Sequence, residues 1–207
     1  MTTETAIRER PILFSGEMVR AILDGRKTQT RRVLSKQPLE IIPMKTPGLW
    51  TGLMSRDPNR GVVFKCKYGR PGDRLWVREA ARVTALCGNA AVVQYKADLS
   101  TINALRIPRS HAGLPTAQER ENFYSGRFMP RWASRISLEI TDVRVERVQE
   151  ISVNDSRAEG SPWDEHGFRS EHRPWFIETW NSINAKRGYG WDANPWVWVI
   201  EFKRLDS

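Results

Sequence analysis

Hydrophobic and polar residues alternate over several short runs of this chain, which is the pattern of half-buried β-strands. The clearest run contains Ile136, Leu138 and Ile140, which alternate with polar residues. Short apolar runs predict strands at 11–14 and 61–65. Alternation predicts further strands at 74–79, 90–96 and 196–202, and an extended segment at 27–33. Asp142 interrupts the run after Ile140 and indicates a bulge or turn.

Helical spacing is confined to a few segments. Ser15 is a preferred N-cap residue, and the apolar residues that follow it recur at helical spacing until Gly25, which suits the left-handed end of a helix. Ser152 predicts the start of a shorter helix that closes at Gly160. A third helix is expected to open at Pro174. Its expected apolar stripe consists of Phe176, Trp180 and Ile183.

Short strands with a few helices between them predict an α+β fold, in which helices pack on a small curved sheet or barrel, rather than a parallel βαβ sheet. Residues 1–10 are polar and are interpreted as a flexible tail. Residues 11–207 are interpreted as a single domain. Two stretches without sustained periodicity, at about 35–60 and 97–129, are interpreted as insertions.

The charge of the chain favours a polyanionic partner. Lys and Arg total 33 against 24 for Asp and Glu, which gives a formal net charge of +9. Such a balance is typical of proteins that bind nucleic acid. Cys66 and Cys87 are too far apart for a C-x-x-C site, and no run is apolar enough for a signal peptide or a membrane span. We therefore expect a cytoplasmic protein with reduced thiols and no membrane partner.

The stretch from Gly25 to Arg32 concentrates the candidate chemistry. It places a lysine, hydroxyl groups and a run of arginines directly after the predicted helix end. A lysine can transfer a proton, a threonine can act as a nucleophile, and arginines can hold an anion. Taken alone, the same stretch is also compatible with a helix C-terminus that carries solvated cations.

The spacing Gly25-x-Lys27-x-x-Thr30-x-Arg32 is similar to the G-x-K-x-x-E-x-R signature of the ASCH domain family, a branch of the PUA-like superfold. Thr30 stands where most of that family has glutamate, and the small bacterial N4-acetylcytidine amidohydrolases share this threonine. Segments at 72–77, 151–159 and 197–205 match in the same order. The long form of the chain, with its segment 129–134, also resembles ASCH-like proteins of tailed phages and prophages.

The resemblance implies a PUA-like pseudo β-barrel whose basic cleft holds a nucleobase or nucleoside. It also implies that Lys27, Thr30 and Glu159 are catalytic, without a cofactor. Thr30 would attack the acyl group, Lys27 would act as base if its pKa is lowered, and Glu159 would protonate the leaving nitrogen. In a regular strand Lys27 and Thr30 would point to opposite faces, so the chain must turn after Gly25.

Further residues are candidates for substrate binding because they carry charge or an aromatic face near the motif or the predicted strand 74–79. They are Gly25, Arg26, Arg32, Arg74, Trp76, Arg78 and Glu79. Two of these have structural alternatives, since Arg78 and Glu79 can form an ion pair and Trp76 can be an ordinary barrel residue. The polar loop with Asp164, Glu165, His166, Glu171 and His172 matches no strong metal motif, so we expect no metal.

The first functional hypothesis is an amidohydrolase that removes an N4-acyl group from cytidine or a related modified nucleobase. The alternative is a non-catalytic module that binds RNA or modified DNA, and its expected partner is single-stranded nucleic acid. A nuclease and a phage assembly protein are further possibilities that no residue of the sequence favours.

Overall fold

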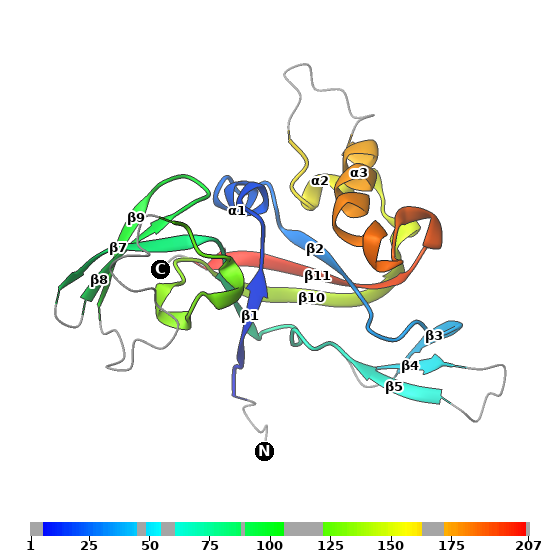
Figure 1. Cartoon of the computed structure of the whole chain (residues 1–207). Coiled ribbons are helices and arrows are strands. Elements are labelled where there is room, and N and C mark those ends of the chain that lie inside the picture. Colours follow the sequence, from blue (N-terminus) through cyan, green and yellow to red (C-terminus); the bar gives the residue numbers. More distant parts are fainter. Residues whose placement is uncertain are drawn as a thin grey trace.

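The structure is a computed structural model that describes residues 6–44, 49–54, 61–87, 90–105, 122–162 and 172–205. At its centre is a five-stranded sheet with the strand order β1–β6–β10–β11–β2 (Figure 1). Its strands are β1 Glu9–Leu13, β2 Gln29–Val33, β6 Arg74–Arg78, β10 Ser137–Arg147 and β11 Trp196–Leu205.

The central sheet is built on the long antiparallel pair β10–β11, whose register runs from Ser137↔Leu205 to Arg147↔Trp196. The register shifts between Ile140 and Asp142, where the sequence predicted a bulge or turn. Strand β6 pairs antiparallel with β10, and β2 pairs antiparallel with β11. Strand β1 pairs parallel with β6. The α+β class and the curved sheet are therefore confirmed. In the described residues the sheet stays open, with β1 and β2 as its edges.

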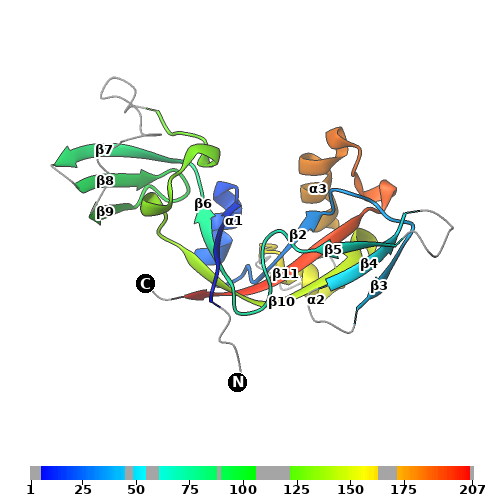
Figure 2. The same cartoon turned by 90° about the horizontal axis from the view of Figure 1, so that it is seen from below.

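Two smaller antiparallel sheets flank the central one, at opposite ends of it (Figure 2). One consists of β3 Glu40–Pro43, β4 Leu49–Leu53 and β5 Gly61–Lys65. The other consists of β7 Ala81–Cys87, β8 Ala90–Tyr95 and β9 Thr101–Leu105. The predicted insertion at 35–60 thus contains the strands β3 and β4, and the insertion at 97–129 contains β9. The division into a tail and one domain stays a prediction.

Strand β7 was missed in the sequence because a bulge hides its alternation. Its pairing with β8 shifts between Val83 and Ala85. An extra residue in one strand moves all later side chains to the opposite face, which breaks the period of two.

Three α-helices occur in the described residues, α1 Gly16–Leu23, α2 Val153–Ala158 and α3 His172–Asn184. Their expected caps are present. The Ser15 side chain accepts a hydrogen bond from the Met18 backbone N–H, Ser152 accepts one from Asp155, and Gly25 has a φ of +74°. Among the described helices, none combines the length and the apolar character that a membrane crossing needs.

Helix α3 corrects two expectations. It begins at His172, so Pro174 lies inside the first turn and not at its first position. Its buried face runs through Phe176, Trp180 and Asn184, whereas Ile183 is 47% exposed. Residues spaced by four stay on one face of a helix, and Asn184 takes the place expected for Ile183 by donating its side-chain N–H to the Trp180 carbonyl oxygen.

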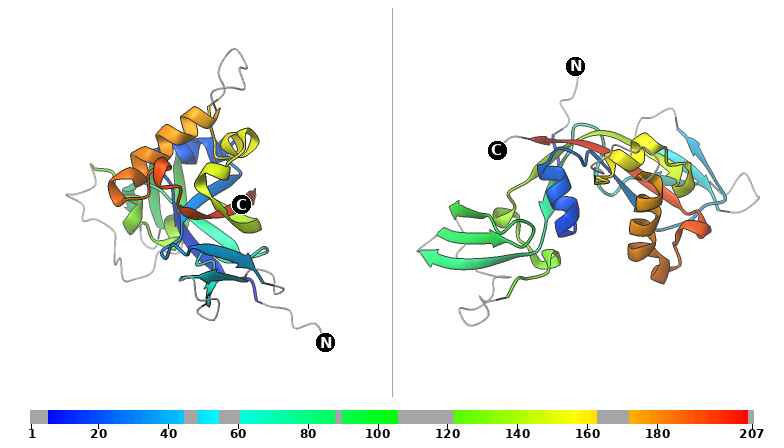
Figure 3. Two further views of the ribbon diagram at one scale, coloured as in Figure 1. Left: turned by 90° about the vertical axis from the view of Figure 1, so that its right-hand side faces the viewer. Right: turned by 90° about the horizontal axis from the view of Figure 1, so that it is seen from above.

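The two faces of β11 bury two different cores. Trp198, Ile200 and Phe202 face a core shared with α1 and the β3–β5 sheet, and the Trp50 and Trp198 rings lie 4.8 Å apart. Val197 and Val199 face α3 on the other side. Figure 3 shows α2 and α3 on one side of the β10–β11 pair and the β3–β5 sheet on the other.

Replacing Ile200, which is fully buried in β11, is expected to destabilise the fold strongly. Ile200→Ala should lower the free energy of unfolding by about 2–5 kcal/mol, because it removes buried apolar contacts and leaves a cavity. The matched control is Ile42→Ala in β3, where the side chain is 46% exposed and the expected loss is below about 0.5 kcal/mol. Urea unfolding of both variants measures the difference, and equal losses would contradict the assignment of the core.

Candidate functional site

The chain turns sharply after α1 and so places Lys27 outside any strand. Gly25 donates its backbone N–H to the carbonyl oxygen of Ile22, and Lys27 donates its own to that of Ala21. Lys27 then pairs with Glu159 in an isolated antiparallel bridge, two residues before β2 begins. The rule that residues three apart in a strand point to opposite faces therefore does not apply to Lys27 and Thr30, since only Thr30 belongs to the strand.

Gly160 makes this approach possible, although in the sequence it was predicted only to close the short helix that starts at Ser152. Its φ is +97°, and a Cβ atom at this position would lie 2.9 Å from Ala21 Cβ and 3.0 Å from Lys27 Cβ. A side chain here would push the segment after α2 away from Lys27. The signal in the sequence was a glycine directly after the predicted short helix, a position where left-handed backbone is common.

The Lys27 ammonium group is fully buried and fully hydrogen-bonded. Its three N–H groups donate to Gln29 O at 2.8 Å, to Glu159 O at 2.7 Å and to Glu159 Oε2 at 2.7 Å. Burial lowers the pKa of Lys27, and the charge of Glu159 and its hydrogen bond act in the opposite direction. An ammonium group with three acceptors matches its three donors one to one.

The Glu159 carboxylate, in contrast, is only half satisfied. Its Oε2 atom binds Lys27, whereas its buried Oε1 atom has no hydrogen-bond partner within the described residues. Arg31 forms an ion pair with Oε1, and its Nη1 atom lies 3.5 Å away, beyond the distance of a good hydrogen bond. A buried acceptor without a donor is costly, so such an atom is expected where a ligand supplies the donor.

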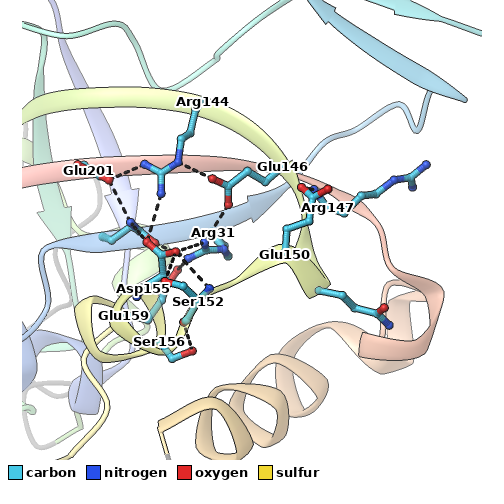
Figure 4. A network of polar contacts seen from close by, with 12 residues as sticks. Arg31, Arg144, Glu146, Arg147, Glu150, Ser152, Asp155, Ser156, Glu159 and Glu201 are labelled. Atoms are coloured by element: carbon cyan, nitrogen blue, oxygen red, sulfur yellow. Dashed lines mark hydrogen bonds and ion pairs between the residues drawn. The ribbon is translucent and has the colours of Figure 1, made fainter. Parts of the chain in front are cut away.

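Arg31 belongs to a polar network that ties β2 to β10, β11 and α2 (Figure 4). Its guanidinium donates to the Gln29 side chain and to Glu146 Oε2, the latter at 3.0 Å, and lies 3.5 Å from Asp155 Oδ2. Arg144 extends the network by pairing with Asp155, Glu146 and Glu201.

Asp155 is ionised at the centre of this network. Burial opposes its ionisation, but hydrogen bonds from Ser152 and Gln29 and the charge of Arg31 hold its pKa below the ordinary value. In the sequence Arg31 counted only as one cation of an arginine run, because nothing local reveals carboxylates more than one hundred residues away.

A pocket of about 140 Å³ runs along the edge strand β2, between α1 and α3. Alternation along β2 turns Thr30 and Arg32 to one face, and both line the pocket, as does Glu159. Aromatic rings contributed by Tyr68, Trp175, Phe176 and Trp180 also line it. The sequence did not single out Tyr68 or Trp175, since neither lies near the motif.

Thr30 and Arg32 both present free polar atoms there. Thr30 is 3% exposed, and its hydroxyl has no hydrogen-bond partner in the part of the chain that the structure describes. Arg32 donates from Nη2 to the carbonyl oxygen of Leu13 at 2.7 Å and lies over the Phe14 ring at 5.1 Å. Its buried Nε–H is without an acceptor among the described residues.

The remaining predicted residues lie outside this pocket. Gly25 and Arg26 line a second cavity of about 490 Å³, where Arg26 donates to the Gly160 carbonyl oxygen at 2.9 Å. Arg74, Trp76 and Arg78 share the less buried face of β6. The roles of these residues in binding substrate stay predictions.

The alternative pairing of Arg78 with Glu79 is wrong. Glu79 forms a two-pronged ion pair with Arg135, with both N–O distances at 2.9 Å. Arg78 instead donates to the Gly126 carbonyl oxygen and lies over the Trp76 ring. Neighbouring residues of an extended segment point to opposite faces, which separates the two side chains.

The acidic and histidine-containing loop lies mostly outside the described residues, including Asp164, Glu165, His166 and Glu171. His172 is described, and its Nδ1 atom lies 2.7 Å from Ser161 Oγ. In the ranges that the structure covers, no three potential metal ligands cluster together.

No family model matches the sequence, and no curated protein matches it. A crystal structure of a protein from Enterococcus faecalis V583, assigned to DUF984, is similar with a TM-score of 0.42 and 9% identity, over 98% of this chain and 83% of that one. An ASCH domain from Lactobacillus crispatus JV V101 is similar with a TM-score of 0.36 and 11% identity, over 95% and 79%.

Gly160→Ala is expected to destabilise the protein more than the control replacement Gly188→Ala, where a Cβ atom would meet nothing within 4 Å. Alanine in left-handed backbone costs about 1–2 kcal/mol at either Gly160 or the control Gly188, whose φ is +80°. Only at Gly160 does the added Cβ collide with Ala21 and Lys27, which adds about 1–3 kcal/mol of overpacking. Urea unfolding compares the two variants, and equal destabilisation would show that the close approach does not matter.

Proposed function

We propose that the pocket along β2 binds the base of an N4-acylated cytidine, or a related modified nucleobase, and removes the acyl group. The observation that carries the proposal is the buried Glu159 Oε1 atom, which lacks a hydrogen bond and lines the same pocket as the free hydroxyl of Thr30. The resemblance of Lys27, Thr30 and Glu159 to the amidohydrolase branch supports the same chemistry.

The pocket suits a planar polar ring. Its volume of about 140 Å³ is close to that of an engineered protein cavity of about 150 Å³ that admits benzene. The Glu159 Oε1 atom offers an acceptor and the Arg32 Nε–H offers a donor, and both are buried. The aromatic side chains Tyr68 and Trp175 provide apolar and π surfaces for a base.

In the proposed reaction, the Thr30 hydroxyl oxygen attacks the acyl carbonyl carbon while Glu159 Oε1 accepts the hydroxyl proton. The oxyanion that forms is stabilised by the Arg32 Nε–H. Glu159 then returns the proton to N4 as the C–N bond breaks, which leaves the cytosine amino group and an acylated Thr30. Water hydrolyses this ester with Glu159 again as the base, and the products are cytidine and a carboxylate.

Lys27 has a different role in this scheme from the base that the resemblance implied. Its three N–H groups are all donated, two of them to Glu159. A neutral amine would leave one of the three acceptors facing a nitrogen lone pair, so the geometry favours an ammonium group that orients the carboxylate. The proton transfer then falls to Glu159, whose second oxygen accepts no hydrogen bond from a described residue.

Hydrolysis of N4-acetylcytidine by the purified protein tests this function. Wild type is expected to release cytidine, detected by chromatography, and Thr30→Ala and Glu159→Gln are each expected to lower kcat/KM by about 10²–10⁴-fold. The controls are Thr28→Ala and Glu178→Gln, because both side chains are exposed and neither lines the pocket. An inert wild type, or full activity of Thr30→Ala, would contradict the proposed reaction.

A non-catalytic module for single-stranded RNA or modified DNA is the second candidate, favoured by the net charge of +9. It predicts that wild type binds a single-stranded oligonucleotide without cleaving an acyl group. The logarithm of the affinity should fall with the logarithm of salt concentration, with a slope of about −0.7 for each phosphate contacted. Titrations at several salt concentrations measure the slope, and a slope near zero would exclude this candidate.

A further inference from the structure

The pocket carries positive charge that no carboxylate of the described residues neutralises. Four cationic side chains line it, and Arg31 is the one paired with acids, Glu146 and Asp155. Arg32, Lys67 and Arg187 also line it, and none of them forms an ion pair with a described carboxylate. The single acid of the lining, Glu159, is already held by Lys27.

The inner and outer parts of the pocket carry different groups. Glu159 and Thr30 are 5% and 3% exposed and form the inner part of the pocket. Lys67 and Arg187 are exposed residues and stand at its mouth. The interior therefore suits a neutral base, because a phosphate there would meet the Glu159 carboxylate, whereas the mouth suits an anion.

Lys67 and Arg187 approach the mouth from different elements. Lys67 lies between β5 and β6, and its Nζ atom lies 5.1 Å from the centre of the Tyr68 ring. Arg187 ends the 3₁₀ helix η5 Ala185–Arg187 that follows α3, and donates to Asn184 Oδ1 at 3.3 Å. These contacts with rings and an amide leave donors of both cations available.

We infer that the ligand carries a phosphate on its sugar, which Lys67 and Arg187 bind at the mouth while the base enters the pocket. The inference rests on the proposed function, since it assumes that the pocket holds a cytosine base. Lysine supplies a point charge and arginine a fork of N–H donors, and both are common phosphate ligands. The phosphate belongs to a mononucleotide or to a nucleotide of a single strand, and the experiment separates these sources.

Isothermal titration of the 207-residue chain with cytidine, 5′-CMP, 3′-CMP and the trinucleotide CpCpC tests the inference. A phosphorylated ligand is expected to bind about tenfold more tightly than cytidine, which is the factor that one charge-assisted hydrogen bond supplies. Lys67→Gln and Arg187→Gln should each reduce this ratio of Kd values. The neighbouring exposed lysines give matched controls, Lys65→Gln and Lys186→Gln, which should preserve the ratio.

The outcomes separate this inference from the proposed function. Tighter binding of phosphorylated ligands without hydrolysis of N4-acetylcytidine supports the phosphate site and rejects the enzyme. Hydrolysis without tighter binding of phosphorylated ligands supports the enzyme and rejects the phosphate site. A gain limited to CpCpC assigns the phosphate to a strand, and a gain with either monophosphate assigns it to a mononucleotide. Equal Kd values for all four ligands, no binding of any phosphorylated ligand, or a gain that survives in Lys67→Gln and Arg187→Gln would overturn the inference.

Discussion

The buried ion pair between Lys27 and Glu159 holds together the parts of the chain on which the site depends. The two side chains are 0% and 6% exposed, and they join segments 132 residues apart in the sequence. Breaking such a pair by removing one partner typically costs about 3–5 kcal/mol, because the other charge is left buried without compensation. The pair fixes the turn after α1 against the end of α2, and the Thr28 backbone N–H donates to the Ala158 carbonyl oxygen beside it.

The ion pair also fixes the start of β2, and the side chains on the two faces of this strand have different partners. Gln29 and Arg31 point toward α2 and bind the carboxylates of the network, which fixes the edge strand to β10 and β11. Thr30 and Arg32 alternate with them and line the pocket. An edge strand has one row of backbone groups without a partner strand, so side chains from both of its faces can border one cavity. The pairing register of β2 with β11 therefore decides both which side chains join the network and which line the pocket.

The chemistry proposed for the pocket follows from which polar atoms the fold satisfies and which it leaves free. The Lys27 ammonium group is saturated, so it orients the carboxylate, while Glu159 Oε1 and the Arg32 Nε–H remain available to a ligand. At the mouth, Lys67 and Arg187 add charge that a neutral base does not need. The hydrolysis proposal depends on the inner atoms and the phosphate proposal on the outer ones, so each can fail without the other.

By itself the sequence determined the elements whose signals are local. The alternation along β11, the Ser15 cap and the left-handed Gly25 were all predictable, because side-chain period and cap chemistry depend on neighbouring residues. The motif order placed Lys27 and Glu159 together as candidates through a family resemblance, without showing how they meet. Only the tertiary structure decided their contact, the network around Arg31 and the aromatic lining of the pocket. Strand order and helix packing bring those partners together from distant parts of the sequence, and no local pattern around either residue reveals the contact.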